Sequence, residues 1–379
     1  MSPPSRGKSQ IRPAVVGVGL IALDIVVSAD STKDLLSYAG GTCGNVLSVL
    51  SFLGWDSYPI ARLNGDVASL RVKADFRRWG VHLDFAECEP TTDTPIIVQV
   101  IQRSQESGTH HRFESSCPFC GHLLPRFKSV TLDAVEPLLR AMSTPAVFFI
   151  DRLSPASLEM ARIAATRGAV VVFEPSGKAA ERLFAEALAL AHVVKYSEER
   201  SGSLREAMES RHTKFLEIQT LGGKGLRYRN RLPGSALPRD WKHLTAYRLP
   251  DIVDTCGAGD WCTAGFIASI CRNGLNGLLA ASAADVEESL CYGQALAAWN
   301  CEFEGARGGM YCTDKNDFDR QVREIMSGGR SSNLRDALPK RDLKIADRIC
   351  PACEKTPVAL GMGTGQNRQM VRSANRKIG

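Results

Sequence analysis

The chain lacks any apolar run that approaches the roughly 20 residues required to span a membrane. An apolar stretch does begin at Pro13, but Asp24 interrupts it and no small-residue cleavage site follows cleanly. We therefore interpret it as a buried strand rich in Val and Ile, not as a signal peptide. These absences predict a soluble, cytoplasmic protein with no membrane partner. In that compartment the 12 cysteines are expected to be reduced thiols or metal ligands rather than disulfides.

A strong charge of either sign is also absent, since the net charge is only +6 over 379 residues. Part of that charge lies in basic stretches at the two ends, which we interpret as solvated termini. No recognisable nucleic-acid-binding module accompanies it, so we expect no nucleic-acid partner. The length suffices for one large domain or two small ones with a sizeable core, and no internal repeat divides it.

Short apolar strands alternate with helical segments in the second half of the chain. The segments VFFID, VVVFEP and HVVKYS have the length and the apolar character of buried strands. A helix between the first two is expected to begin after the N-cap candidate Ser154 and to end at Gly168. This alternation predicts an α/β fold with a central, mostly parallel sheet covered by helices on both faces.

The remaining elements are predicted from local periodicity. A half-exposed strand at TPIIVQVIQ is expected to pair with THHRFESS across a polar turn. The other expected strand lies at 14–19 and continues through IALDIVV. One helix is expected to begin at about 45 and another to end at 80. A helical region from 260 to 299 and a last core helix at 317–326 complete the prediction.

The stretch VDTCGAGDWCTAGF combines Gly257, Ala258 and Gly259 with the acid Asp260 at the start of a predicted helix. Glycines let backbone N–H groups converge on an anion, and a helix N-terminus adds free N–H groups and partial positive charge. Asp260 could then take a proton from an attacking hydroxyl. The alternative is a Gly-rich helix entry with Asp260 as its N-cap. The GxxxxGK[ST] spacing of a P-loop is absent.

The same stretch resembles the C-terminal signature of the ribokinase-like (PfkB) carbohydrate kinases, and the resemblance extends from Arg12 to Met326. Four further segments match in the expected order: GLIALD, GGTCGN, TLGGKG and EGARGGM, the last resembling a segment that closes the adenine pocket. The resemblance implies a ribokinase-like three-layer α/β/α sandwich with a small β lid. It also implies transfer of the γ-phosphoryl group of ATP to a hydroxyl of a sugar or a nucleoside.

The resemblance assigns roles to individual residues. Asp260 would be the general base, and Gly257, Ala258 and Gly259 the anion hole. The substrate-binding residues would be Asp24, Gly40, Gly41, Asn45 and Asp151, and the nucleotide-binding residues Lys195, Ser197, Thr220, Gly222 and Gly225 together with Gly257 and Gly259. For Asp151 a cap at the end of its strand is an equal alternative. Lid strands in this family often pair between two copies of the chain, so a homodimer through the lid is an open alternative.

The chain departs from the family pattern at KYSEER, where the family commonly has NxxE and organises Mg²⁺ through water. Ser197 replaces the Asn and Arg200 replaces the Glu, so Glu198 or Glu199 is expected to substitute. Mg²⁺ itself is still expected, because phosphoryl transfer needs its charge neutralised. Thr42 and Cys43 stand where many sugar kinases have a Lys, which argues against simple ribose or fructose. Asp254 could bind a monovalent cation, or make only a loop hydrogen bond.

Two CPxC knuckles lie more than two hundred residues apart. The spacing lets Cys117 and Cys120, and likewise Cys350 and Cys353, face one tetrahedral Zn²⁺ ion. His111 or His122 could replace a ligand; unrelated thiols and a redox pair are the alternatives. Four thiolates leave no open position on the ion, so the zinc is expected to be structural.

These patterns predict that the chain consists of two parts. Residues 12–326 form the predicted kinase core, including lid segments near 24–38 and 86–115. Residues 327–379 form a C-terminal extension that zinc would dock onto the 117–120 knuckle. Two other functions stay open: a ligand-binding or regulatory protein that kept the fold without turnover, and a zinc-ribbon nucleic-acid protein.

Overall fold

The computed structural model describes residues 12–28, 35–87, 89, 92–104, 108–117, 120–176, 179–200, 214–233, 237, 239–249, 251–328, 344–345 and 350. Its strands are β1 (Ala14–Val18), β2 (Ala22–Val27), β3 (Leu36–Gly40), β4 (Asp56–Ile60), β5 (Ile96–Ser104), β6 (Gly108–Glu114), β7 (Val147–Ile150), β8 (Val170–Phe173), β9 (Val193–Ser197), β10 (Leu216–Thr220), β11 (Leu226–Asn230), β12 (Lys242–Leu244) and β13 (Lys344–Ile345).

The helices are α1 (Thr42–Phe52), α2 (Val67–Arg78), α3 (Val135–Ala141), α4 (Pro155–Thr166), α5 (Glu181–Leu190), α7 (Ala258–Ile270), α8 (Gly274–Ala280), α9 (Ala283–Asn300), α10 (Gly308–Cys312) and α11 (Lys315–Met326). Short 3₁₀ turns are η1 (Leu132–Ala134), η2 (Glu198–Arg200) and η3 (Gly222–Lys224). None of the helices in this described part combines the length and the apolarity that a membrane-spanning helix needs.

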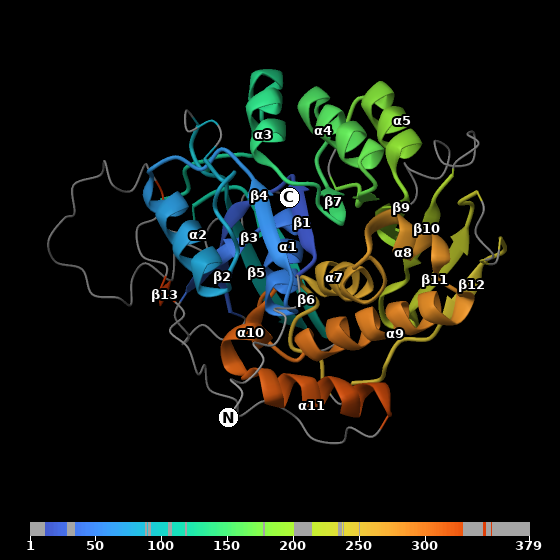
Figure 1. Ribbon diagram of the computed structural model, residues 1–379. Helices are drawn as coiled ribbons and strands as arrows, with labels where there is room; N and C mark the ends of the chain where they lie inside the picture. Colours follow the sequence, from blue (N-terminus) through green and yellow to red (C-terminus); the bar gives the residue numbers. More distant parts are fainter. Residues whose placement is uncertain are drawn as a thin grey trace, which may run out of the picture.

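A central sheet of eight strands has the order β12-β11-β10-β9-β8-β7-β1-β4, and its six strands from β10 to β4 run parallel (Figure 1). Alternate side chains of each strand enter opposite cores. Val147 and Phe149 pack with α1, α7 and α9, whereas Phe148 and Ile150 pack with α3, α4 and α5. Because both faces are covered, the inner strands β1, β7 and β8 are apolar throughout, and the predicted α/β fold is confirmed.

A second sheet, which we call the lid sheet, has the order β13-β3-β2-β5-β6. The predicted pairing of β5 with β6 is present and antiparallel, from Val98 opposite Glu114 to Ser104 opposite Gly108. The short strand β13 pairs antiparallel with β3, so a segment near the C-terminus borders the lid sheet. The sequence contained no signal for that pairing, since two residues are too few for a strand pattern.

The prediction of one continuous strand through residues 14–27 is wrong, because β1 belongs to the central sheet and β2 to the lid sheet. The break has a physical cause: the N–H of Leu20 donates to the Asp151 carboxylate at 2.8 Å instead of to a neighbouring strand. Gly19 permits the approach, because a Cβ there would lie 1.6 Å from the same carboxylate oxygen. The chain thus passes from one sheet to the other at the end of β1.

The prediction of one helical region from 260 to 299 is also too simple, because three helices occupy it. The first of them, α7, ends at Ile270, and α8 begins at Gly274, whose φ of +61° differs from that of a helical residue. Ser282 then caps α9 by accepting from the N–H of Asp285 at 3.2 Å, and the Asp285 side chain accepts from Ser282 in return. The last core helix begins two residues earlier than predicted, after its N-cap Asp314.

The guanidinium of Arg307 is fully buried and connects the lid sheet to the core. It donates to Asp75 Oδ2 on α2 at 2.8 Å and to the carbonyl oxygen of Ala39 on β3. Tyr311 donates to the same Asp75 oxygen at 2.7 Å. A buried cation with these partners is stable only while its carboxylate is present.

We expect Asp75→Ala to lower the free energy of unfolding by about 3–5 kcal/mol, because it leaves the Arg307 charge buried and unpaired. Urea unfolding followed by circular dichroism measures the change. The control is Asp319→Ala, which removes an exposed partner of Lys315 on α11 and should cost less than about 1 kcal/mol. Equal costs for the two variants would show that the buried pair does not support the fold.

Candidate active site

A cleft of about 680 Å³ lies between the carboxyl ends of the parallel strands and the lid sheet. The lid contributes Asp24, His111 and Phe113, and the loop after β6 contributes residues 124–127. The central sheet contributes side chains at or just after the ends of β8, β9 and β10. Ligands of open α/β sheets bind at this edge, so the cleft is the candidate active site.

The start of α7 lies in this cleft, as the sequence predicts for a GAGD loop. Gly257 is the N-cap with φ of 75°, and no side chain caps the helix. A Cβ on Gly257 would lie 2.3 Å from the Ala306 carbonyl oxygen, so only glycine fits the turn. An uncapped helix N-terminus that faces a cleft offers its N–H groups and partial positive charge to an anion.

Asp260 is not an N-cap; it lies in the first turn of α7 and accepts a hydrogen bond from Asn45 Nδ2 at 2.8 Å. Asn45 is itself oriented, because its Oδ1 accepts from Arg307 Nε at 3.1 Å. Burial raises the pKa of Asp260 well above its ordinary value, and the nearby Glu174 carboxylate raises it further. The Asn45 hydrogen bond and the Lys195 ammonium act in the opposite direction. The site therefore holds an oriented carboxylate of increased basicity.

A buried ion pair that the sequence analysis missed lies beside this carboxylate. Lys195 Nζ, from the middle of β9, donates to Glu174 Oε1 at 2.9 Å, and Thr263 of α7 donates to Glu174 Oε2 at 2.6 Å. Burial lowers the Lys195 pKa, but the neighbouring carboxylates outweigh it, so the net shift is upward and the lysine is charged. A Cβ on Gly259 would lie 3.5 Å from Lys195 Nζ. The pair therefore faces the glycine loop.

Glu174 could have been found from the sequence. It follows the buried strand β8 directly, and polar residues at the carboxyl ends of neighbouring parallel strands meet at one edge. The interpretation of VVVFEP as a strand alone leaves Glu174 unconnected with Lys195, which lies on β9, the next strand in the chain.

The acceptor residues predicted from GLIALD and GGTCGN meet at the lid end of the cleft. Asp24 is 6% exposed, and its Oδ2 accepts from the N–H of Gly41 at 3.4 Å. Its Oδ1 has no hydrogen-bond partner among the described residues. Gly40 makes room for this side chain, since a Cβ there would lie 1.9 Å from Asp24 Oδ2. Burial raises the pKa of Asp24 to about 7, with the Gly41 hydrogen bond opposing it.

Asp151 is buried beneath the cleft and does not line it. Its Oδ1 accepts from Leu20, and its Oδ2 accepts from Arg152 and Ser176, each at 2.8 Å. Burial raises its pKa, and the Arg152 charge opposes the shift. These contacts are those of a cap at the strand end, the alternative that the sequence left open. Arg152 and Ser176, which the sequence analysis did not single out, do line the cleft.

The predicted nucleotide residues are only partly brought together. Lys195, Ser197 and Thr220 line the cleft, whereas Gly222 and Gly225 do not. Gly225 has φ of +103°, and a Cβ there would lie 2.1 Å from the Leu244 carbonyl oxygen, so this glycine is required by the packing of the β11 turn. Glu198 and Glu199 lie on the exposed turn η2, outside the cleft lining.

Asp254 is fully buried and its oxygens are already engaged. The N–H of Cys256 donates to Oδ1 and the N–H of Gly305 to Oδ2, each at 2.9 Å, while Gln99 donates to Oδ2. The ring of His111 lies 3.3 Å from Oδ1. Gly305 belongs to the segment EGARGGM, so its bond to Asp254 places this segment beneath the start of α7. None of the residues of the segment lines the cleft.

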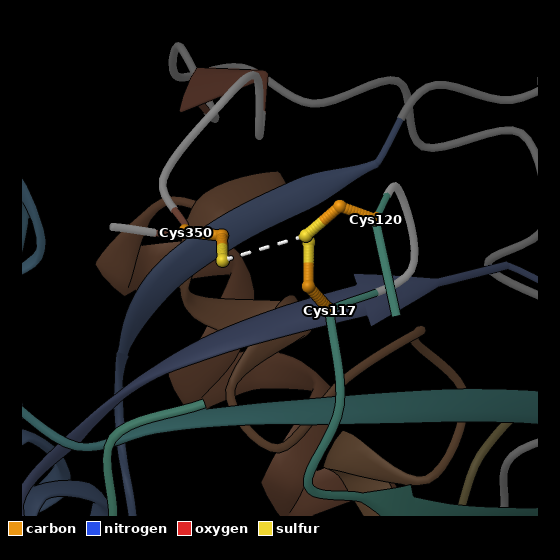
Figure 2. A group of neighbouring side chains, drawn as sticks. All are labelled: Cys117, Cys120 and Cys350. Carbon is orange, nitrogen blue, oxygen red and sulfur yellow. Dashed lines mark hydrogen bonds between the residues drawn. The ribbon is translucent and has the colours of Figure 1, made fainter. Parts of the chain in front are cut away.

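Three of the four predicted zinc ligands lie together, away from the cleft. The side chains of Cys117, Cys120 and Cys350 point toward one another, with their sulfur atoms all within 4.8 Å (Figure 2). Cys353 lies outside the described residues. Neither His111 nor His122 belongs to this group.

The chain belongs to the pfkB family of carbohydrate kinases, since the sequence profile of that family matches residues 14–311. It is therefore a kinase of this class, a phosphotransferase that acts on a hydroxyl group. No curated protein is significantly similar to the chain in sequence.

Solved structures of such kinases share the fold. Aminoimidazole riboside kinase from Salmonella enterica, complexed with aminoimidazole riboside and an ATP analogue, is 19% identical with a TM-score of 0.60, covering 81% of this chain and 99% of its own. Arabidopsis thaliana ribokinase with ribose and ATP is 19% identical with a TM-score of 0.57, covering 83% and 99%. Vibrio cholerae fructokinase with fructose, ADP and calcium is 16% identical with a TM-score of 0.60, covering 82% and 99%. The predicted ribokinase-like fold is confirmed.

The raised pKa of Asp24 makes stability depend on pH. Its pKa is about 7 in the folded chain, against roughly 3.9 in an unfolded chain. The folded chain thus holds a proton that the unfolded chain releases, and this stabilisation is complete below about pH 4 and lost as pH rises through 7. We expect the wild type to lose up to about 4 kcal/mol relative to Asp24→Asn between these limits.

Urea unfolding of both proteins at pH 4.5 and pH 8.5 measures this difference. Asp319→Asn, on the exposed face of α11, should follow the wild type at both pH values. An unchanged difference between the wild type and Asp24→Asn would mean that Asp24 titrates as an ordinary exposed acid.

Proposed function

We propose that the chain transfers the γ-phosphoryl group of ATP to a hydroxyl of a sugar or sugar-like small molecule, with Asp260 as the general base. The observation that carries the proposal is the position of Asp260. It lies in one cleft, with Asp24 and Asn45 on the lid side and Lys195 and the start of α7 on the sheet side. A base in this position can contact an acceptor hydroxyl while the helix start contacts the phosphate.

Asp260 would take the proton of the acceptor hydroxyl as the oxygen attacks. Its increased pKa suits this role, because a base with a pKa nearer neutrality accepts a proton more readily than an ordinary carboxylate. The Asn45 hydrogen bond holds one carboxylate oxygen, which fixes the direction in which the other can accept. Asn45 is therefore proposed as the residue that positions the base.

Asp24 would hold a neighbouring hydroxyl of the acceptor. Its buried Oδ1 has no partner among the described residues, and a substrate hydroxyl would supply one. With a pKa of about 7 the carboxyl can either accept or donate at neutral pH. A polyol is the ligand that uses both abilities.

The helix start and Lys195 would stabilise the transferring group. The N–H groups beside Gly257 and Gly259 suit the equatorial oxygens of a phosphoryl group, and the ammonium of Lys195 adds a full positive charge nearby. Glu174 and Thr263 keep that ammonium in place. Ser197 and Thr220 extend this end of the cleft toward the proposed nucleotide site.

Mg²⁺, when bound, neutralises phosphate charge in reactions of this kind. Glu174 and Ser197 are among the residues that line the cleft, and their side-chain oxygens are of the hard kind that Mg²⁺ prefers, directly or through water. We assign them this role in place of Glu198 and Glu199, which lie outside the lining.

A nucleoside is the second candidate acceptor. The lid end of the cleft includes the apolar side chains of Ile96, Phe113 and Phe127, against which a base could stack. One relative of the same fold is a kinase complexed with a riboside, and another was solved with ribose. Measuring ADP release with a panel of monosaccharides and nucleosides distinguishes the two classes.

We expect Asp260→Asn to lower kcat by about 10²–10⁴-fold, because general-base catalysis contributes a factor of this size. Binding of ATP and acceptor, measured by calorimetry, should change little, since Asn has nearly the same shape. A wild type that binds both ligands and phosphorylates no acceptor would instead indicate a binding protein that kept the fold.

The pH dependence of kcat/KM should report the charges around Asp260. Activity is lost as pH falls through the pKa of Asp260, because the protonated acid cannot accept a proton. Glu174→Gln removes a negative charge that raises this pKa, so the acidic limb should move to lower pH. Lys195→Met removes a positive charge that lowers it, so the limb should move to higher pH.

The two variants act as controls for each other, because each alters one member of the same ion pair. Limbs that move in the same direction, or not at all, would contradict the assignment of Asp260 as the titrating base. Steady-state rates between pH 4 and 9, with acceptor concentrations well below KM, provide the measurement.

A further inference from the structure

The group formed by Cys117, Cys120 and Cys350 is not used by the proposed reaction. Cys117 and Cys120 belong to the loop after β6, and Cys350 lies 230 residues beyond Cys120. Cys117 and Cys350 are 4% and 3% exposed, and Cys120 is exposed. Two buried thiols and a third thus converge from distant parts of the chain.

The spacing of the sulfur atoms identifies the chemistry. The Sγ atoms of Cys120 and Cys350 are 3.8 Å apart, far longer than the roughly 2.05 Å of a disulfide (Figure 2). Thiolates that bind one Zn²⁺ at about 2.3 Å in tetrahedral geometry are about 3.8 Å from one another. The observed separation therefore matches the edge of a zinc–sulfur tetrahedron.

The loop between Ser116 and Leu123 is closed, which holds its two cysteines on one side. The N–H of Cys117 donates to the His122 carbonyl at 2.8 Å, and the N–H of Gly121 donates back to the Cys117 carbonyl at 2.9 Å. Gly121 has φ of +74°, a conformation that favours glycine. A bridge between Ser116 and Leu123 completes the closure.

We propose that Cys117, Cys120 and Cys350 bind a structural zinc ion; each thiol releases its proton to solvent and binds the metal as a thiolate. Cys353 lies outside the described residues; the CPAC spacing of the sequence predicts it as the fourth ligand, which would close the coordination sphere. A closed sphere has no position for substrate, so this zinc stabilises structure and takes no part in the reaction.

The zinc site would fasten the C-terminal segment across the wall of the acceptor site. Glu114 and Ser115 enter the cysteine loop and Leu124 leaves it, and all three line the cleft. The N–H of Leu124 donates to the Ser115 carbonyl at 2.8 Å, which joins the two sides of the loop at its base. On the other side, the β13 pairing with β3 brings the C-terminal segment to the lid sheet.

This arrangement makes the metal a determinant of acceptor binding, an inference that rests on the proposed function. Without zinc, Cys350 would no longer be held to the loop of Cys117 and Cys120, and the ends of that loop that line the cleft, Ser115 and Leu124, would lose this connection. The nucleotide residues Lys195 and Thr220 lie at the other end and should be unaffected. Acceptor KM should therefore rise about tenfold, with the KM for ATP unchanged and kcat changed less than about threefold.

The metal is tested independently of activity. Full-length protein purified under reducing conditions should contain about one zinc per chain by elemental analysis, and Cys350→Ser and Cys353→Ser should each remove most of it. Cys291→Ser is the matched control, because Cys291 is a half-buried cysteine on α9 outside the group. Cobalt loaded in place of zinc should show the thiolate charge-transfer and tetrahedral d–d absorption of a sulfur-rich site.

The zinc site would be contradicted if the protein contained no zinc and its apo form took none up. Retention of zinc in Cys350→Ser would also contradict it. So would a wild-type mass two hydrogens lower than that of the reduced chain, which would show a Cys120–Cys350 disulfide. Chelation followed by zinc return separates loss of metal from failure to fold. Hydrogen exchange of residues 114–127 should increase on chelation and recover with zinc.

The predicted effect of zinc on the acceptor KM can be contradicted independently of the zinc site itself. A wild type with about one zinc per chain, together with an unchanged acceptor KM in a zinc-free Cys350→Ser variant, would leave the metal site in place and contradict its role at the cleft wall. Normal zinc content with no phosphorylation of any acceptor would contradict the proposed function and leave the metal site untouched.

Discussion

The buried guanidinium of Arg307 is the interaction on which the geometry of the cleft depends. It bonds to the backbone of β3 in the lid sheet, to Asp75 on α2, and to Asn45 on α1. Asn45 then donates to Asp260 on α7. One cation thus sets the position of the lid strand and of the proposed base together. Its cost is the burial of a charge, which the Asp75 carboxylate and two flanking tyrosine rings offset.

Among the described residues that line the cleft, carboxylates lie together with one lysine, Lys195, and the arginines Arg126 and Arg152. Asp24 and Glu174 are buried and Asp260 is half-buried, and burial raises the pKa of Asp24 and of Asp260. Lys195 is paired with Glu174 rather than with Asp260. This pairing leaves Asp260 basic, whereas burial leaves Asp24 able to hold or release a proton near neutral pH. The two acids therefore suit different tasks, one as base and one as a partner for a neighbouring hydroxyl.

Much of the fold could be predicted from sequence, because buried parallel strands and their helices have strong local patterns. The exceptions have tertiary causes. The strand predicted through 14–27 breaks because Leu20 bonds to Asp151, 131 residues later. The importance of Arg307 depends on partners 232 to 268 residues away, for which the sequence has no signal.

The residues of the candidate site also include some that local sequence patterns could predict and others that depend on tertiary contacts. The GAGD loop could be predicted because glycine spacing and a helix start are local features. Glu174 was missed because its role depends on which strands are neighbours, although its place after a buried strand was a usable signal. The paired cysteines were recognisable from spacing, and the structure brings Cys350 to the knuckle of Cys117 and Cys120.

The central claim is that one cleft holds an acceptor hydroxyl against Asp260 and a phosphate against the start of α7. The most direct test is a crystal structure of Asp260→Asn with a non-hydrolysable ATP analogue, Mg²⁺ and an acceptor that the wild type phosphorylates. The account predicts an acceptor hydroxyl within hydrogen-bond distance of residue 260, and the terminal phosphate beside the N–H groups of residues 257–259. Either group bound elsewhere, or an acceptor hydroxyl that points away from residue 260, would contradict it.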